Sequence, residues 1–208
     1  MSKRLIFLAA VVIAGALWLG RAPVSHEIEL VDERPVSFSR DLSIEQPPIQ
    51  KEFDRGRTPI PAGDFWLTPV ADFEIEAKVL GRRNYRLGQE ARLSPMDLAV
   101  GWGPMSDQEV LEDISVSQSG RFGRWSAPHL PLSTDEINHS FANIHIIPAG
   151  AEIAADLDRI DADEPIRMSG YLVDVHKENG WRWDTSTSRT DTGDGACEIL
   201  LVTRVAHP

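Results

Sequence analysis

Residues 150–175 (GAEIAADLDRIDADEPIRMSGYLVDV) join an amphipathic helix to a long strand. Within residues 150–160, Ile153, Leu157 and Ile160 recur at helical spacing, with acidic residues elsewhere on the helical wheel. This pattern predicts a helix that rests one apolar face on a core. The second half of the stretch is rich in apolar residues, which predicts a strand directly after the helix.

Short apolar runs on both sides of this stretch predict a domain made mostly of strands. Phe73, Ile75, Ala77 and Val79 alternate with charged residues, which is typical of a half-buried strand. We expect further strands at residues 98–100, 114–125, 143–147, 166–175, 181–185 and 198–205. The turn residues 178–180 predict a hairpin between the strands on either side of them.

Two capping boxes predict short helices. In the first, Ser106 and Glu109 have the spacing at which each side chain caps the other's backbone, so a helix should begin at Asp107. Ser133 and Glu136 repeat the spacing and predict one more turn of helix.

The order of these elements indicates an α+β fold that is mostly β. The passage from the helix at 150–160 into the next strand resembles the passage into the fourth strand of an OB-fold, where a helix closes the bottom of a barrel. The resemblance implies a small, partly closed, OB-like β-barrel. A two-layer sandwich would give the same order of elements, so both architectures stay open.

The N-terminus has the pattern of an export signal. Residues 1–4 include Lys3 and Arg4, and residues 5–20 (LIFLAAVVIAGALWLG) are uncharged. This run is somewhat shorter than the ~20 residues of a typical spanning helix. We expect an uncleaved transmembrane signal anchor, a cytoplasmic end at residues 1–4 and a single-pass protein of a bacterial inner membrane. Cleavage after Ala16 would instead release a soluble secreted protein.

Residues 21–63 contain six prolines among alternating charges and few apolar clusters. We interpret them as a proline-stiffened tether between the membrane and a domain at residues 64–208, in the periplasm or outside the cell. The alternative interpretation is an irregular strand on the surface of that domain.

The charge of the chain narrows the class of partner. Its 208 residues include 32 acidic and 21 Lys and Arg side chains, for a formal net charge of −11. Nucleic acids repel so acidic a protein, so we expect none as a partner. The single cysteine, Cys197, excludes an intramolecular disulfide.

Residues 138–147 (NHSFANIHII) contain the first candidate binding residues, His139, Asn143 and His145. Histidine is a common zinc ligand. The chain lacks the HExxH, HxH and CxxC patterns, however. We therefore favour the interpretation that these histidines bond to nearby backbone, rather than that they bind a metal. We expect no cofactor. If residues 143–147 form a strand, Asn143 and His145 share one face.

Residues 185–198 (TSTSRTDTGDGACE) form a polar loop before the last strand. Arg189 is a candidate ligand for a carboxylate or phosphate, and Asp191 is a candidate acid or base. Cys197 is a candidate nucleophile if an imidazole lies beside it. The alternatives are a turn held by its own hydrogen bonds and a small cysteine side chain in the core.

Two other features are candidates for contacts with a ligand or a surface. Trp181 and Trp183 share one face of a predicted strand, where they provide either a stacking surface or core packing. Residues 81–86 (GRRNYR) are a basic cluster in an acidic protein, either a solvated hairpin tip or a contact for lipid head groups or an acidic partner.

These patterns favour a membrane-anchored envelope protein whose extracytoplasmic domain is a binding or assembly module with a protein partner in the envelope. The alternative is an anchored hydrolase, with or without a metal, that uses His139, His145 and Asp191.

Overall fold

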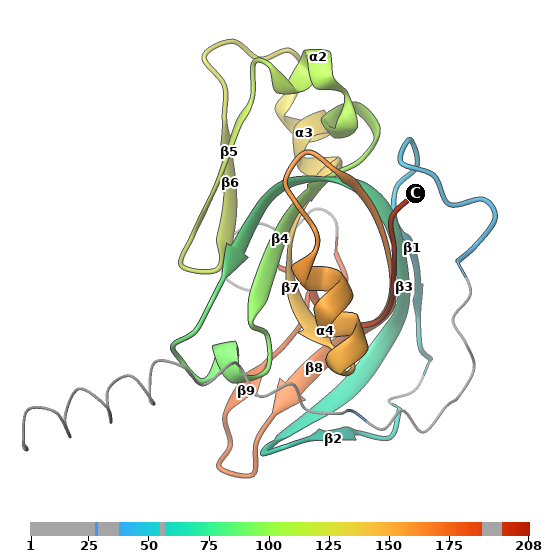
Figure 1. The fold of residues 1–208 in the computed structure, drawn as a ribbon, viewed down its shortest axis with the longest axis vertical. Coiled ribbons are helices and arrows are strands. Elements are labelled where there is room, and N and C mark those ends of the chain that lie inside the picture. The colour runs from blue at the N-terminus through green and yellow to red at the C-terminus, as the bar shows by residue number, and fades with distance from the viewer. Residues whose placement is uncertain (1–27, 29–37, 55–56, 189–196) are drawn as a thin grey trace, which may run out of the picture.

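The strand β3 (Phe65–Asn84) organises the sheet in the computed structural model, which describes residues 28, 38–54, 57–188 and 197–208 (Figure 1). It is 20 residues long, and alternate side chains from Phe65 to Val79 are buried, as the spacing of Phe73 to Val79 predicts. β3 pairs antiparallel with β1 (Ile49–Glu52), β2 (Ile60–Ala62), β4 (Met96–Gly101) and β8 (Pro165–His176). Because β3 is so long, β8 pairs with its first part, from Trp66 to Lys78, and β4 pairs with its last part, from Lys78 to Asn84.

Five strands close into a ring because β3 pairs with both β4 and β8. Around the ring the order is β3, β4, β7 (Phe141–Pro148), β10 (Ile199–Ala206), β8 and back to β3. The pair β7 and β10 is parallel, and the other pairs are antiparallel. The predicted α+β fold that is mostly β is confirmed.

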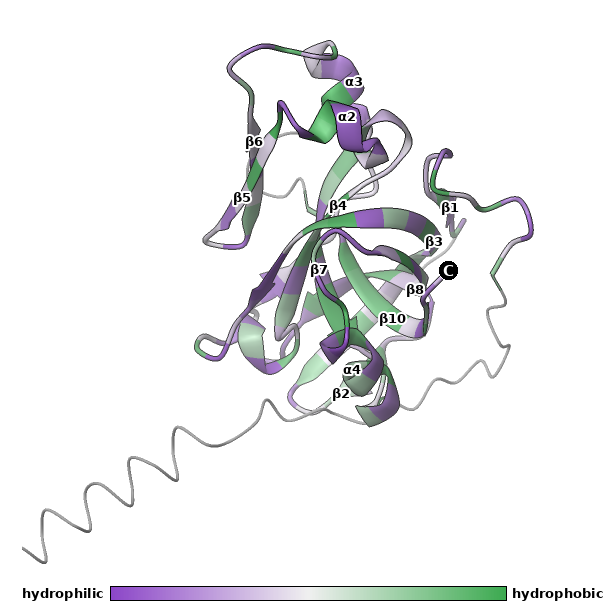
Figure 2. Cartoon of the chain, turned by 45° about the horizontal axis from the view of Figure 1, so that its top comes forward, coloured by the Kyte–Doolittle hydropathy of each residue, from purple (hydrophilic) through white to green (hydrophobic). Residues whose placement is uncertain are grey.

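The core on the ring sheet has two parts, and a third, separate cluster gathers Met105, Ile114 and Ile137. Figure 2 shows the apolar residues along the ring strands. The larger part fills the ring with side chains from all five ring strands and from α4 (Ala151–Asp158). The smaller part lies on the opposite face, where Ile28, β2 and residues beside β9 (Arg182–Trp183) cover it. Since both of their faces are covered, β4 and β7 are buried almost continuously, whereas β3 alternates.

The predicted helix at residues 150–160 is confirmed as α4, which packs on β7 and β10. The second capping box is also confirmed: Ser133 and Glu136 cap α3 (Thr134–His139) reciprocally. The first is one residue out of place. α2 (Gln108–Leu111) is capped by Asp107, whose side chain accepts from the Glu109 amide, while the Ser106 hydroxyl donates to the Gly103 carbonyl in η2 (Gly103–Ser106).

The predicted single strand at residues 114–125 is wrong. These residues form the hairpin of β5 (Ser115–Ser119) and β6 (Phe122–Ser126), which stands beside the ring as a second sheet (Figure 1). Gly120 and Arg121 both have positive φ, at 57° and 68°, so they make a tight two-residue turn. The glycine marks a reversal of the chain rather than a bend in one strand.

The described part of the predicted tether is packed on the domain, which corrects the interpretation of residues 21–63 for this part. Leu42 is buried, β1 and β2 pair with β3, and Ile28 donates its amide to the Ala149 carbonyl. For residues 49–52 and 60–62 the structure agrees with the alternative, strands on the domain surface. The predicted anchor at residues 5–20 lies outside the described residues. Among the described helices, none is long and apolar enough to cross a membrane.

Candidate functional site

Asp97 on β4 is the centre of a polar cluster on the face of the sheet opposite the ring interior. Its side chain is fully buried. Oδ1 accepts a hydrogen bond from the Arg121 guanidinium at 2.9 Å and lies 2.9 Å from Nδ1 of His145. Asp97 and His145 are directly opposite in the pairing of β4 with β7, so the sheet itself sets the second contact. Oδ2 has no hydrogen-bond partner among the described residues.

Arg121 reaches this cluster from the turn between β5 and β6. Its guanidinium also donates to the Ser94 carbonyl at 2.8 Å. The guanidinium carbon lies 4.0 Å from the centre of the Tyr85 ring and 5.4 Å from the Trp183 ring. The positive φ of Arg121 directs this long side chain onto the sheet, so the hairpin is held against the ring by a buried charge.

Four residues predicted as candidates meet at this cluster. His145 lies beside Trp183, with ring centres 4.8 Å apart. Asn143 donates to the Arg121 carbonyl at 3.1 Å, and the Cys197 sulfur lies 3.9 Å from the same carbonyl oxygen. The expected shared face of Asn143 and His145 is confirmed, because the residues between and after them, Ile144 and Ile146, are in the ring interior.

The other predicted candidates lie elsewhere. His139 is exposed at the end of α3, with Nδ1 2.7 Å from the Asp135 carbonyl, so the structure does not bring it to the Asp97 carboxylate that holds His145. Trp181 packs edge-on against Phe65 at 5.8 Å, and its ring centre lies 6.3 Å from that of Trp183, so the two tryptophans are neighbours and both pack against the smaller part of the core. Arg189 and Asp191 lie outside the described residues. Within the described ranges, no group of three or more His, Cys, Asp and Glu side chains is arranged to hold a metal ion.

Sequence reasoning missed Asp97, Arg121 and Tyr85. One signal was available: Asp97 immediately precedes an apolar run, and a carboxylate in a buried strand needs a partner. Burial, followed by the nearby Asp97 charge, raises the pKa of the Tyr85 phenol to about 12. Its hydroxyl lies near Asp97 and Arg121, and both it and Asp97 Oδ2 fall outside strict hydrogen-bond geometry with any described residue.

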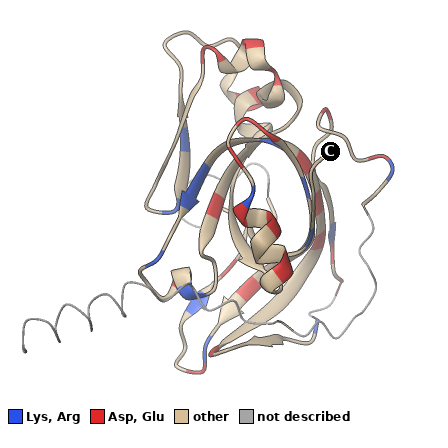
Figure 3. Ribbon diagram, viewed as in Figure 1, with Lys and Arg blue, Asp and Glu red and all other residues tan. Residues whose placement is uncertain are grey.

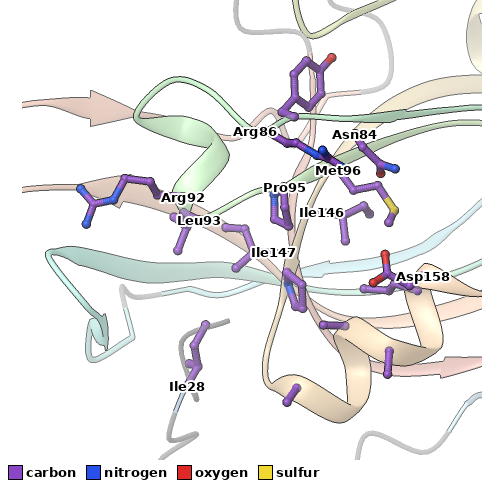
Figure 4. A pocket seen from close by; sticks show the side chains of 16 residues that line it. Ile28, Asn84, Arg86, Arg92, Leu93, Pro95, Met96, Ile146, Ile147 and Asp158 are labelled. Atoms are coloured by element: carbon purple, nitrogen blue, oxygen red, sulfur yellow. The ribbon is translucent and has the colours of Figure 1, made fainter. Parts of the chain in front are cut away.

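Tyr85 also lines a pocket of about 390 Å³ between β4, β7, α4 and the loop that carries η1 (Glu90–Arg92) (Figure 4). Its walls are mostly apolar, and Figure 4 shows Met96, Ile146 and Ile147 between the η1 loop and α4. The polar cluster and the pocket share the segment of residues 84–97. Arg121, bound to Ser94 and Asp97, therefore fixes one wall of the pocket.

The polar residues that line the pocket are Asn84, Tyr85, Arg86, Arg92 and Asp158. Asp158 pairs with Arg82 at 3.0 Å, and Arg92 pairs with Asp64 at 3.1 Å. A hydrogen bond from Lys177, together with Arg92, lowers the pKa of Asp64. Arg86 makes no ion pair with any described residue.

Comparisons with known proteins found no relative of this chain. No family model matches the chain, and neither a curated protein nor a solved structure is significantly similar to it.

Proposed function

We propose that the protein is a membrane-anchored envelope protein whose ring domain is a binding or assembly module. Residues 5–20 are the anchor, Lys3 and Arg4 hold the N-terminus in the cytoplasm, and the domain lies in the periplasm or outside the cell. The support for the anchor is the sequence pattern alone.

The ring is the barrel of an OB-fold in this proposal. Two features of the topology support it: the five ring strands neighbour one another in the order first, second, third, fifth, fourth and first, and a helix lies between the third and the fourth. OB-folds bind ligands on the face of the second and third strands and with the loops beside it. In this chain those strands are β4 and β7, and the η1 loop follows the first strand.

The residues that line the pocket are the observation that favours a binding function over a catalytic one. The described residues that line it include no histidine, cysteine, serine or lysine, so they supply no nucleophile with a base beside it. The charged groups of the polar cluster bond to one another. A pocket with apolar walls and a few polar groups is typical of a ligand-binding site.

Native mass spectrometry of the full chain, extracted from membranes without chelator, tests this proposal. We expect the mass of the intact chain beginning at Met1, and we expect EDTA to leave this mass unchanged. The His139→Ala and His145→Ala variants should differ from the wild-type chain only by the mass of the substitution, with no loss of metal. A zinc-sized adduct that EDTA removes, and that either substitution abolishes, would replace the binding module by the metal-dependent hydrolase. A chain that begins near Leu17 would show release by signal peptidase.

The pair of Asp97 and His145 favours a second candidate, a hydrolase without metal. A carboxylate on Nδ1 orients an imidazole so that Nε2 is free to act as a base, and the one thiol of the chain, Cys197, contacts the same cluster. In this form of the alternative, Asp97 replaces Asp191 and His139 has no role.

Alkylation of Cys197 separates the two candidates without a known substrate. For a binding module we expect the alkylation rate with iodoacetamide to be low at pH 6 and to rise only at alkaline pH, because the thiol then has no base beside it. We also expect His145→Gln to leave this profile unchanged. Because the chain has one cysteine, the rate reports that residue alone. Rapid alkylation at pH 6 that His145→Gln abolishes would support the hydrolase.

A further inference from the structure

We propose that the pocket between α4 and the η1 loop takes an acyl chain of an anionic lipid from the membrane that holds the anchor. This inference rests on the proposed function, because it assumes that residues 5–20 are in a bilayer. It adds the chemical class of the ligand: a long apolar chain with a negatively charged head group.

The volume and the walls of the pocket suit a hydrocarbon chain. Its volume of about 390 Å³ is in the range of small-molecule sites. The apolar residues that line it come from four parts of the chain and include Ile28, Leu93, Met96, Ile146, Ala154 and Leu157. A chain buried among them would leave water at a gain in free energy with each methylene group.

The charge around the pocket suits an anionic head group. Of the charged residues that line it, two are arginines, Arg86 and Arg92, and one is acidic, Asp158. Arg82 pairs with Asp158 and Asp64 pairs with Arg92 from outside the lining. The two carboxylates are each bonded to an arginine, and Arg86 is left over in the described part of the chain. Figure 3 shows Lys and Arg at the end of β3 that leads into this loop. In a protein with a net charge of −11, this local excess of positive charge favours an anion.

The length of the chain places the pocket near the membrane. Ile28 is buried, lines the pocket and bonds to the Ala149 carbonyl. Eight steps along the chain separate it from Gly20, the end of the predicted anchor, and at ~3.3–3.6 Å per residue they span at most about 29 Å. Whatever path residues 21–27 take, the pocket therefore stays within reach of lipid head groups.

A photoactivatable lipid tests the inference on the full chain. The chain is reconstituted in phosphatidylcholine vesicles that contain phosphatidylglycerol with a diazirine at the end of one acyl chain, and labelled peptides are mapped after illumination. We expect label on two regions: residues 5–20, which contact the bilayer core, and the pocket walls at residues 84–96 and 146–158. The first region reports the anchor, and the second reports the pocket.

Three variants and a second probe test the pocket label. Ala154→Trp fills the pocket and should reduce pocket label to background, while label on residues 5–20 stays. Arg86→Glu should reduce pocket label about fivefold or more, as expected for a basic residue at an anionic surface. Arg124→Glu, which changes an exposed side chain on β6, is the matched control and should have no effect. The same diazirine on phosphatidylcholine should label the pocket about fivefold less than on phosphatidylglycerol.

The possible results distinguish the lipid pocket from the membrane anchor. Label on residues 5–20 without label on the pocket overturns the inference and leaves the anchor in place. Pocket label without label on residues 5–20 keeps the pocket and overturns the anchor. Equal pocket label from both lipids, or pocket label only from a free photoactivatable fatty acid, overturns the assignment to an anionic membrane lipid. A circular dichroism spectrum of each variant checks that the fold is intact, and Arg86→Glu changes only an exposed side chain.

Discussion

Replacing Asp97 by alanine is expected to cost about 3–5 kcal/mol of the free energy of unfolding, because the change leaves buried partners without their counterpart. The Arg121 guanidinium is 15% exposed and the His145 side chain 5%, so water can replace the lost carboxylate only poorly. Urea titration of the full chain in lipid nanodiscs, followed by tryptophan fluorescence, measures the loss.

The control for this prediction is an ion pair of the same type at the surface. Asp184 and Arg182 lie 3.2 Å apart with side chains 57% and 68% exposed, so Asp184→Ala should change the free energy of unfolding by no more than about 1 kcal/mol. Adding Arg121→Ala to Asp97→Ala should restore part of the loss, since it removes the unpaired charge. If Asp97→Ala costs no more than Asp184→Ala, the buried pair does not hold the hairpin on the ring.

The local elements could be predicted from the sequence because their signals lie within a few residues. The capping box of Ser133 and Glu136 and the apolar spacing in residues 150–160 depend on one turn of chain, and both are confirmed. The first capping box shows the limit of such signals. Ser106 and Asp107 are both good caps, and only the bond from Ser106 to Gly103 in the preceding 3-10 turn decides between them.

The polar cluster could not be predicted because its members are far apart in sequence. Asp97 and Arg121 are 24 residues apart, and Asp97 and His145 are 48 apart. Their contact requires the register of β4 on β7, which has no local signal, and a two-residue turn at Gly120 and Arg121. Gly120 is a local signal for that turn, but it also fits a bend within one strand. Of the histidine stretch, sequence reasoning found the face that Asn143 and His145 share. It had no means of finding the carboxylate opposite.

Closure of the ring also depends on distant residues. β3 pairs with β8 over most of its length, and Gly170 on β8 is opposite Phe73 on β3 and Val202 on β10. A Cβ atom at Gly170 would lie 1.9 Å from the Leu201 carbonyl oxygen, which is less than any contact that real Cβ atoms make. Only glycine lets the backbones of β8 and β10 approach so closely at this irregular pairing.

Gly170→Ala is therefore expected to prevent the ring from closing, with a loss of more than about 4 kcal/mol or no folded protein at all. Gly150→Ala is the matched control: no heavy atom lies within 4 Å of the added Cβ, and the backbone there is extended with φ at −175°. It should cost about 1 kcal/mol or less, as a weaker helix cap. Hydrogen exchange then distinguishes the cause. We expect backbone amides in both β8 and β10 to lose protection. Loss of protection confined to the few residues around Gly170 would mean that the ring tolerates the methyl group, and that the close approach of β8 and β10 is not what closes it.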